Sequence, residues 1–87
     1  MSQVLLLDAL NLIKTGSFLP GKEMEKAHEI SQKHEGVPLF DWVHALVHRA
    51  EGDDANAGYW YRRAGKTGHS GSIEEEWQII RTETDKA

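Results

Sequence analysis

Two histidines four positions apart, His44 and His48, are the residues with the clearest chemical potential. On a helix this spacing places both imidazoles on one face, as metal ligation requires. Asp41 and Glu51 lie about one turn beyond the pair on either side, where a carboxylate could orient a metal-binding imidazole. Ala45 stands where the zinc-protease motif H-E-x-x-H has its general base, so the sequence lacks that motif.

These histidines have two interpretations. In one, His28 or Glu29 from the preceding helix approaches, and His28, His44 and His48 form the centre of a metal-binding or acid–base enzyme. In the other, the pair belongs to a polar helix face, with one imidazole bonded to a carboxylate and one in water. The sequence favours the second interpretation, which predicts a non-catalytic protein without a cofactor.

A second group of polar side chains shares the face of the next predicted helix: Asn56, Tyr59, Arg62 and Arg63. An arginine three or four residues after a tyrosine can stack on its ring. Two guanidinium groups together can hold a carboxylate or phosphate. An acidic peptide or carboxylate is therefore the expected ligand, unless Glu51, Asp53 and Asp54 neutralise the arginines and leave a solvated face.

The elements that carry both groups form a predicted antiparallel pair of helices, over 39–51 and 54–65. The apolar stripe of the first is Leu39, Phe40, Val43, Leu46, Val47 and Ala50. The facing residues of the second are Ala57, Trp60, Tyr61 and Ala64.

Pro38 suits a first helical turn, and Gly52 suits a left-handed closing position. Either Asp53 or Asp54 can cap the second helix. Trp42, Trp60 and Tyr61 are expected to pack, with their polar atoms at the edge of the core.

This pair resembles a single tetratricopeptide repeat, through Gly52-Asp53, Ala57, Tyr61 and Ala64. The resemblance covers roughly 41–69. It departs from the repeat at His44 and His48, where leucine and tyrosine are usual, and it lacks the closing proline. The segment also resembles a group of small bacterial helical proteins with the signature H-A-x-x-H-R-x-E-G-D-x-x-N-A-x-Y-W-Y-R-R-A-G. Both resemblances imply a helical fold, and neither implies an activity.

The remaining helices are expected over 2–15, 22–35 and 72–83, with a frayed end after about residue 83. The last begins with a capping box, Ser72 and Glu75, and presents Ile73, Trp77 and Ile80. Because strand alternation is missing, we expect one all-α domain over 1–87, with four or five short antiparallel helices.

The first helix has an unusually wide apolar side: Leu5, Leu6, Leu7, Ala9, Leu10, Leu12 and Ile13. Two arrangements would cover it. The last helix could lie across it through Trp77 and Ile80, or two copies of the chain could pair as a homodimer. The sequence favours the dimer slightly.

The composition argues against several classes of protein and of binding site. A formal charge of −4 argues against nucleic-acid binding, and the absence of cysteine excludes disulfides and thiolate sites. The apolar N-terminal run contains Asp8, lacks the features of a signal peptide and is too short to span a bilayer. We therefore expect a cytoplasmic protein–protein interaction module that does not engage a membrane.

Overall fold

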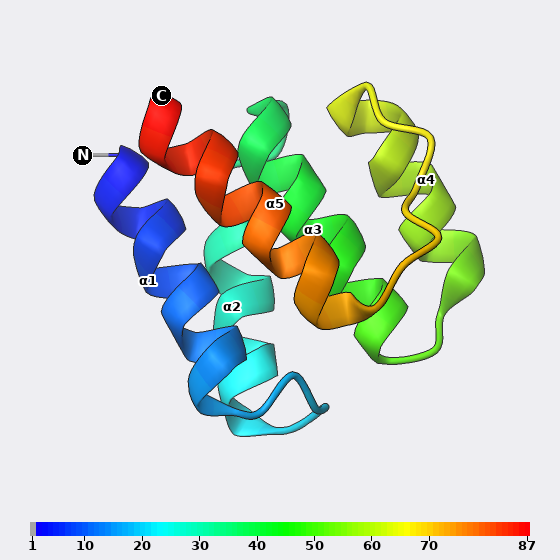
Figure 1. Cartoon of the computed structure of the whole chain (residues 1–87), viewed down its shortest axis with the longest axis horizontal. Helices are drawn as coiled ribbons and strands as arrows, with labels where there is room; N and C mark the ends of the chain where they lie inside the picture. The colour runs from blue at the N-terminus through cyan, green and yellow to red at the C-terminus, as the bar shows by residue number, and fades with distance from the viewer. Residues whose placement is uncertain (1) are drawn as a thin grey trace.

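The computed structural model describes residues 2–87, which form five helices and no strand. They are α1 (Ser2–Thr15), α2 (Lys22–Gln32), α3 (Pro38–Ala50), α4 (Asp54–Ala64) and α5 (Ile73–Lys86) (Figure 1). The predicted all-α fold is confirmed. Two boundaries differ from the prediction. α2 ends at Gln32 rather than Glu35 and continues as a turn to Gly36, and α5 continues to Lys86 instead of fraying after about residue 83.

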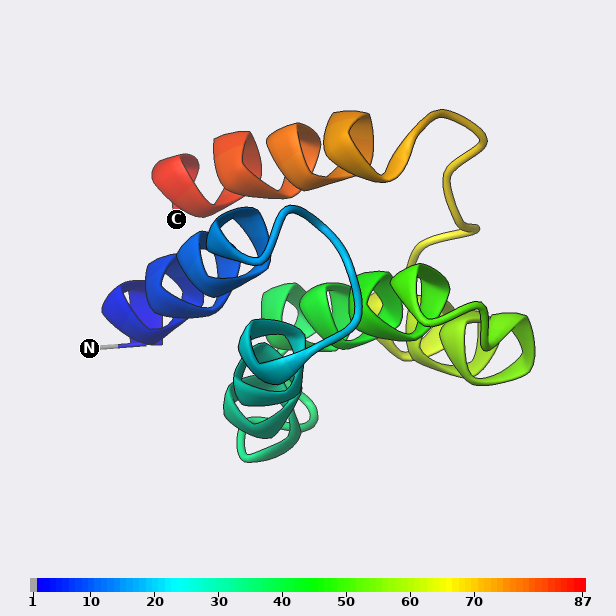
Figure 2. The ribbon, with the colours of Figure 1, turned by 90° about the horizontal axis from the view of Figure 1, so that it is seen from below.

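α3 is the central helix, because it contacts all four of the others. Figure 2 shows α3 beside α4, with α2 and α5 lying away from each other around it. Because other helices surround α3, one prediction about its polar side is wrong. The side of α3 that was expected to be polar and outward carries Asp41 and His44, which are only 1% and 2% exposed. Asp41 accepts a hydrogen bond from the Gly36 N–H, at 3.1 Å, within the turn that precedes α3.

α4 packs mainly on α3, and this is the most extensive helix–helix contact in the fold. Six of the residues predicted on the two facing stripes are buried at this contact: Phe40, Val43, Val47, Ala57, Tyr61 and Ala64. Asp53 caps α4 by accepting from the Asn56 N–H, and Gly65 ends it in the left-handed conformation, with φ of 75°. The predicted helical pair is therefore present.

α5 lies across α1 and covers part of its wide apolar side. The Trp77 Nε1–H donates to the Leu10 carbonyl at 2.8 Å, and Gln3 Nε2 donates to the Thr84 carbonyl at 3.0 Å. The second contact joins the first turn of α1 to the last turns of α5, which places the two chain ends on the same side of the molecule (Figure 1). The capping box predicted for α5 is present, with both Ser72–Glu75 hydrogen bonds formed.

Burial along α1 is uneven. The fully covered residues are Leu6, Ala9, Leu10 and Ile13, and Leu12 is partly buried against the core. Leu5 is 36% exposed and Val4 is 57% exposed. One chain therefore covers most of the apolar side of α1 but not its first turn.

The turn after α1 does not close on a left-handed glycine. Ser17 and Phe18, not Gly16, take positive φ values, of 59° and 62°. Gly16 serves close packing instead, because a Cβ atom there would lie 2.9 Å from the Cβ of Glu23 on α2. No helix within residues 2–87 is both long and apolar enough to cross a bilayer.

Candidate functional site

The structure brings His28, His44 and His48 together. The α2 and α3 helices pack side by side, and this places His28 against the i, i+4 pair of α3. The three ring centroids lie 4.6, 5.1 and 5.0 Å apart, which is nearly an equilateral triangle. One nitrogen atom from each ring lies within 4.8 Å of the corresponding atoms of the other two rings, so all three nitrogens can face one common point. The polar-face interpretation therefore does not describe how these side chains lie.

Neighbouring side chains enclose this histidine cluster. Trp60 of α4 stacks on His44, with ring centroids 3.9 Å apart and 15° between the planes. On the other side, the His48 Nδ1 atom lies 3.6 Å from Glu51 Oε1 and 3.7 Å from Asp53 Oδ2. The cluster thus has an aromatic wall on one side and two carboxylates on the other.

Hydrogen bonding within the cluster is incomplete. His28 Nε2 and His44 Nε2 lie 2.8 Å apart, so one of them donates to the other. The Nδ1 atoms of His44 and His48 are buried and have no hydrogen-bond partner. Buried polar atoms are normally paired, because an unpaired one loses its interaction with water and gains nothing in return.

Burial and mutual repulsion disfavour the charged forms of His44 and His48. Burial lowers the pKa of His44 from 6.5 to about 3, with smaller contributions from His28 and His48. Burial and then His28 also lower the pKa of His48, against the opposing effect of Glu51 and Asp53. His44 is therefore neutral at pH 7, with a lone pair free of a proton.

The aromatic and arginine group on α4 lies on the outer face of that helix. Tyr59 is 43% exposed, and both Arg62 and Arg63 are exposed. Arg63 Nη1 donates to the Tyr59 hydroxyl at 2.9 Å, and the guanidinium carbon lies 5.8 Å from the Tyr59 ring centroid and 5.3 Å from that of Trp60. The predicted contact of arginine with an aromatic ring is present.

Two of the three acidic residues expected to neutralise these arginines, Asp53 and Glu51, have other partners. Asp53 caps α4 and binds the Asn56 side chain, which donates at 2.6 Å. Glu51 lies beside His48. The ion pairs found within residues 2–87 include neither Arg62 nor Arg63. Asn56 therefore serves the helix cap, while the two guanidinium groups lack a carboxylate contact.

Sequence reasoning missed Glu76, which lies in the first turn of α5 and is fully buried. Its carboxylate accepts from Trp42 Nε1 at 2.9 Å and from the Tyr61 hydroxyl at 2.7 Å. It also pairs with Arg49 at 2.7 Å, and Arg49 in turn donates to the Gly71 carbonyl. Burial, followed by the bond to Glu76, raises the pKa of Tyr61 well above its usual range. The signal was the spacing, because Glu76 lies at i+3 in the stripe of Ile73, Trp77 and Ile80.

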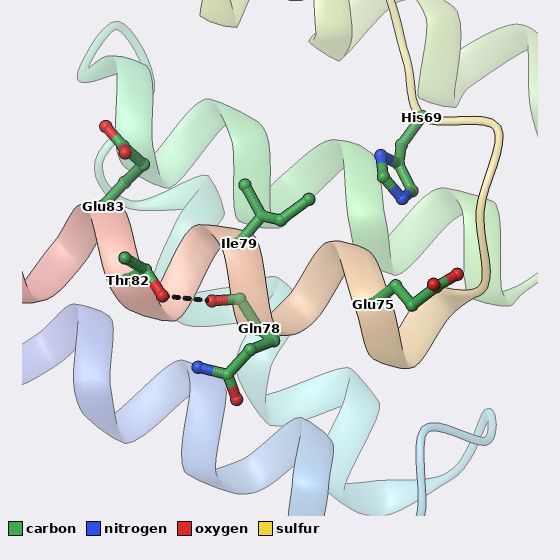
Figure 3. A pocket seen from close by; sticks show the side chains of 6 residues that line it. All are labelled: His69, Glu75, Gln78, Ile79, Thr82 and Glu83. Atoms are coloured by element: carbon green, nitrogen blue, oxygen red, sulfur yellow. Dashed lines mark hydrogen bonds between the residues drawn. The ribbon is translucent and has the colours of Figure 1, made fainter.

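A shallow groove runs along the outer face of α5 (Figure 3). Its lining residues are His69, Glu75, Gln78, Ile79, Thr82 and Glu83. In Figure 3 the His69 ring extends from the loop toward the same groove as Ile79, and Thr82 Oγ1 donates to the Gln78 carbonyl. Glu75 is already held by the capping box. The groove contains none of the predicted site residues.

Comparison of the chain with protein-family models, with curated proteins and with solved structures finds no match.

Proposed function

We propose that this protein is a non-catalytic interaction module that binds an acidic segment of a partner protein through the outer face of α4. The observation that carries the proposal is the pair of exposed guanidinium groups, Arg62 and Arg63, which have no carboxylate contact. Arginine is well suited to this role because its planar group can bind a carboxylate with two parallel hydrogen bonds.

The neighbouring aromatic residue supports this proposal. Tyr59 is a large side chain that is 43% exposed, and its hydroxyl holds Arg63 in a fixed position above the helix. Tyrosine and arginine are enriched at protein–protein contacts, because both bury a large area and keep a polar group that can be satisfied. A fixed guanidinium also loses less side-chain freedom on binding than a mobile one.

The charge of the chain indicates which class of partner this face of α4 would bind. The chain has a formal charge of −4, so a basic patch on it is a local exception. An acidic segment would be attracted to Arg62 and Arg63, whereas the net negative charge of the chain disfavours its binding elsewhere. Such a contact is exposed, and we expect its affinity to fall as salt is added.

Fluorescence anisotropy with a labelled peptide of alternating aspartate and glutamate tests the proposal. We expect saturable binding to the wild-type protein, which weakens strongly between 20 and about 200 mM salt. The double variant Arg62→Gln with Arg63→Gln should lose this binding. The matched control, Lys22→Gln with Lys26→Gln on α2, removes the same charge from exposed positions and should retain it. Equal binding by the two double variants contradicts the proposal, as does a wild-type protein that shows no saturation.

A further inference from the structure

We infer that His28, His44 and His48 form a binding site for a divalent transition-metal ion such as Zn²⁺, Ni²⁺ or Cu²⁺. This site is separate from the partner-binding face proposed for α4. The two inferences fail independently, because they use different side chains and different probes.

Geometry is the first support. Three nitrogen ligands of a tetrahedral zinc ion lie about 3.4 Å from one another, given Zn–N bonds of about 2.0–2.1 Å. The closest pair in the cluster, His28 Nε2 and His44 Nε2, lies 2.8 Å apart, and nitrogens of all three rings lie within 4.8 Å of each other. The required separation falls between these values. Small side-chain rotations therefore suffice, without a shift of α2 or α3.

The incomplete hydrogen bonding is the second support. His44 is 2% exposed, and the one hydrogen bond of its ring is the contact with His28 through Nε2. Three imidazoles packed together cannot satisfy one another, because a neutral imidazole has only one donor and one acceptor. A metal ion accepts lone pairs from all three rings at once and removes the need for the short contact between His28 and His44.

The surroundings match those of known metal sites. Glu51 and Asp53 lie 3.6 and 3.7 Å from the Nδ1 atom of His48, just beyond hydrogen-bond distance, so a small rotation would let a carboxylate accept from Nδ1–H and leave Nε2 for the metal. Their negative charges also offset the charge of a dication. Trp60 fixes the plane of His44 by stacking on it.

The ligand set selects the class of ion. Three imidazole nitrogens and no thiolate favour zinc, nickel, copper and cobalt over magnesium and calcium, which prefer oxygen. Three protein ligands leave one position of a tetrahedral ion for water or an external molecule. His28 lies on α2 whereas His44 and His48 lie on α3, so the ion would also fasten these two helices together.

Titration of chelator-treated protein with ZnCl₂, followed by calorimetry, tests this inference. We expect one ion per chain. A parallel titration with CoCl₂ should give the visible absorption of a low-coordinate cobalt site. His28→Gln and His48→Gln should each reduce zinc affinity more than about 100-fold, beyond the 10- to 100-fold typical of outer-shell changes. Glu51→Gln should fall within that smaller range.

The matched control is His69→Gln, which removes a histidine that lies outside the cluster and should leave zinc affinity unchanged. Because His44→Gln could unfold the protein, nitrogen-15 NMR of the imidazoles provides a second measurement on the wild type. Zinc should shift the ring signals of His28, His44 and His48 and leave those of His34 and His69 in place. Uniform shifts of all five histidines, or zinc affinity that survives His28→Gln and His48→Gln, would overturn the inference.

Discussion

The buried carboxylate of Glu76 is held by side chains from two neighbouring helices. It holds Trp42 and Arg49 from α3 and Tyr61 from α4, so it joins α5 to the central helical pair. Glu76→Gln removes the charge and leaves the Arg49 guanidinium without its carboxylate. We expect the free energy of unfolding to fall by at least about 2 kcal/mol, because buried charges and donors lose their partners together.

Urea denaturation measures this change. Glu74→Gln is the matched control, because Glu74 is an exposed glutamate in the same helical turn. It should change the free energy of unfolding by no more than about 0.5 kcal/mol. A Glu76→Gln protein as stable as the control would mean that the buried network adds little.

The lowered pKa of His44 predicts that the free energy of unfolding depends on pH. Its folded-state pKa is about 3, whereas the unfolded chain binds a proton at about 6.5. Between these values the unfolded state carries more protons. The contribution of His44 to the free energy of unfolding is therefore fully present above pH 6.5. It decreases as the pH falls below that value, by up to about 1.4 kcal/mol per pH unit for one such group.

Urea midpoints between pH 7.5 and pH 5, measured with a chelator present, check this dependence. The groups that face His44 are His28 on α2, His48 on α3 and the uncharged Trp60 on α4. His48 has a lowered pKa and adds to the slope. We expect His48→Gln to reduce the slope without abolishing it, because His44 remains. A flat wild-type profile would contradict the lowered pKa of His44.

At the scale of the element, α4 offers a comparison between two glycines. Gly58 lies within the helix, and a Cβ atom there would meet only Arg62 Nη1, at an ordinary contact distance of 3.6 Å. Gly58→Ala should stabilise the fold by about 0.5–1 kcal/mol, because alanine loses less backbone freedom in a helix. Gly65→Ala should destabilise it, because φ at Gly65 is +75°. Thermal unfolding of both variants checks this, and a shift of the same sign in both would contradict it.

The limits of sequence reasoning are visible in the same elements. The capping box of α5 and the Asp53 cap of α4 were predictable, because each depends on residues three positions apart. The burial of Asp41 and His44 was not, because it depends on which helices surround α3. The three histidines could be named from the sequence, but their convergence depends on how α2 packs on α3.

At the scale of the whole molecule, the predicted homodimer through α1 now depends on a smaller surface. α5 and the other helices cover most of the apolar side, which leaves Leu5 exposed next to the exposed Val4. Because stable protein interfaces bury about 1,200 Å² or more in total, we expect self-association to be weak. Sedimentation at hundreds of micromolar should detect a dimer, and Leu5→Lys should dissociate it. A wild-type monomer at that concentration contradicts the dimer.

The buried contacts of Glu76 have a consequence for how this sequence can vary. Trp42, Arg49 and Tyr61 all direct a donor at one carboxylate, so a substitution at position 76 leaves several polar groups unsatisfied at once. A descendant that lost only one of the four would be selected against, whereas an apolar replacement of all four could be stable. These positions are therefore expected to change as a group during evolution, although they are separated by up to 34 places along the chain.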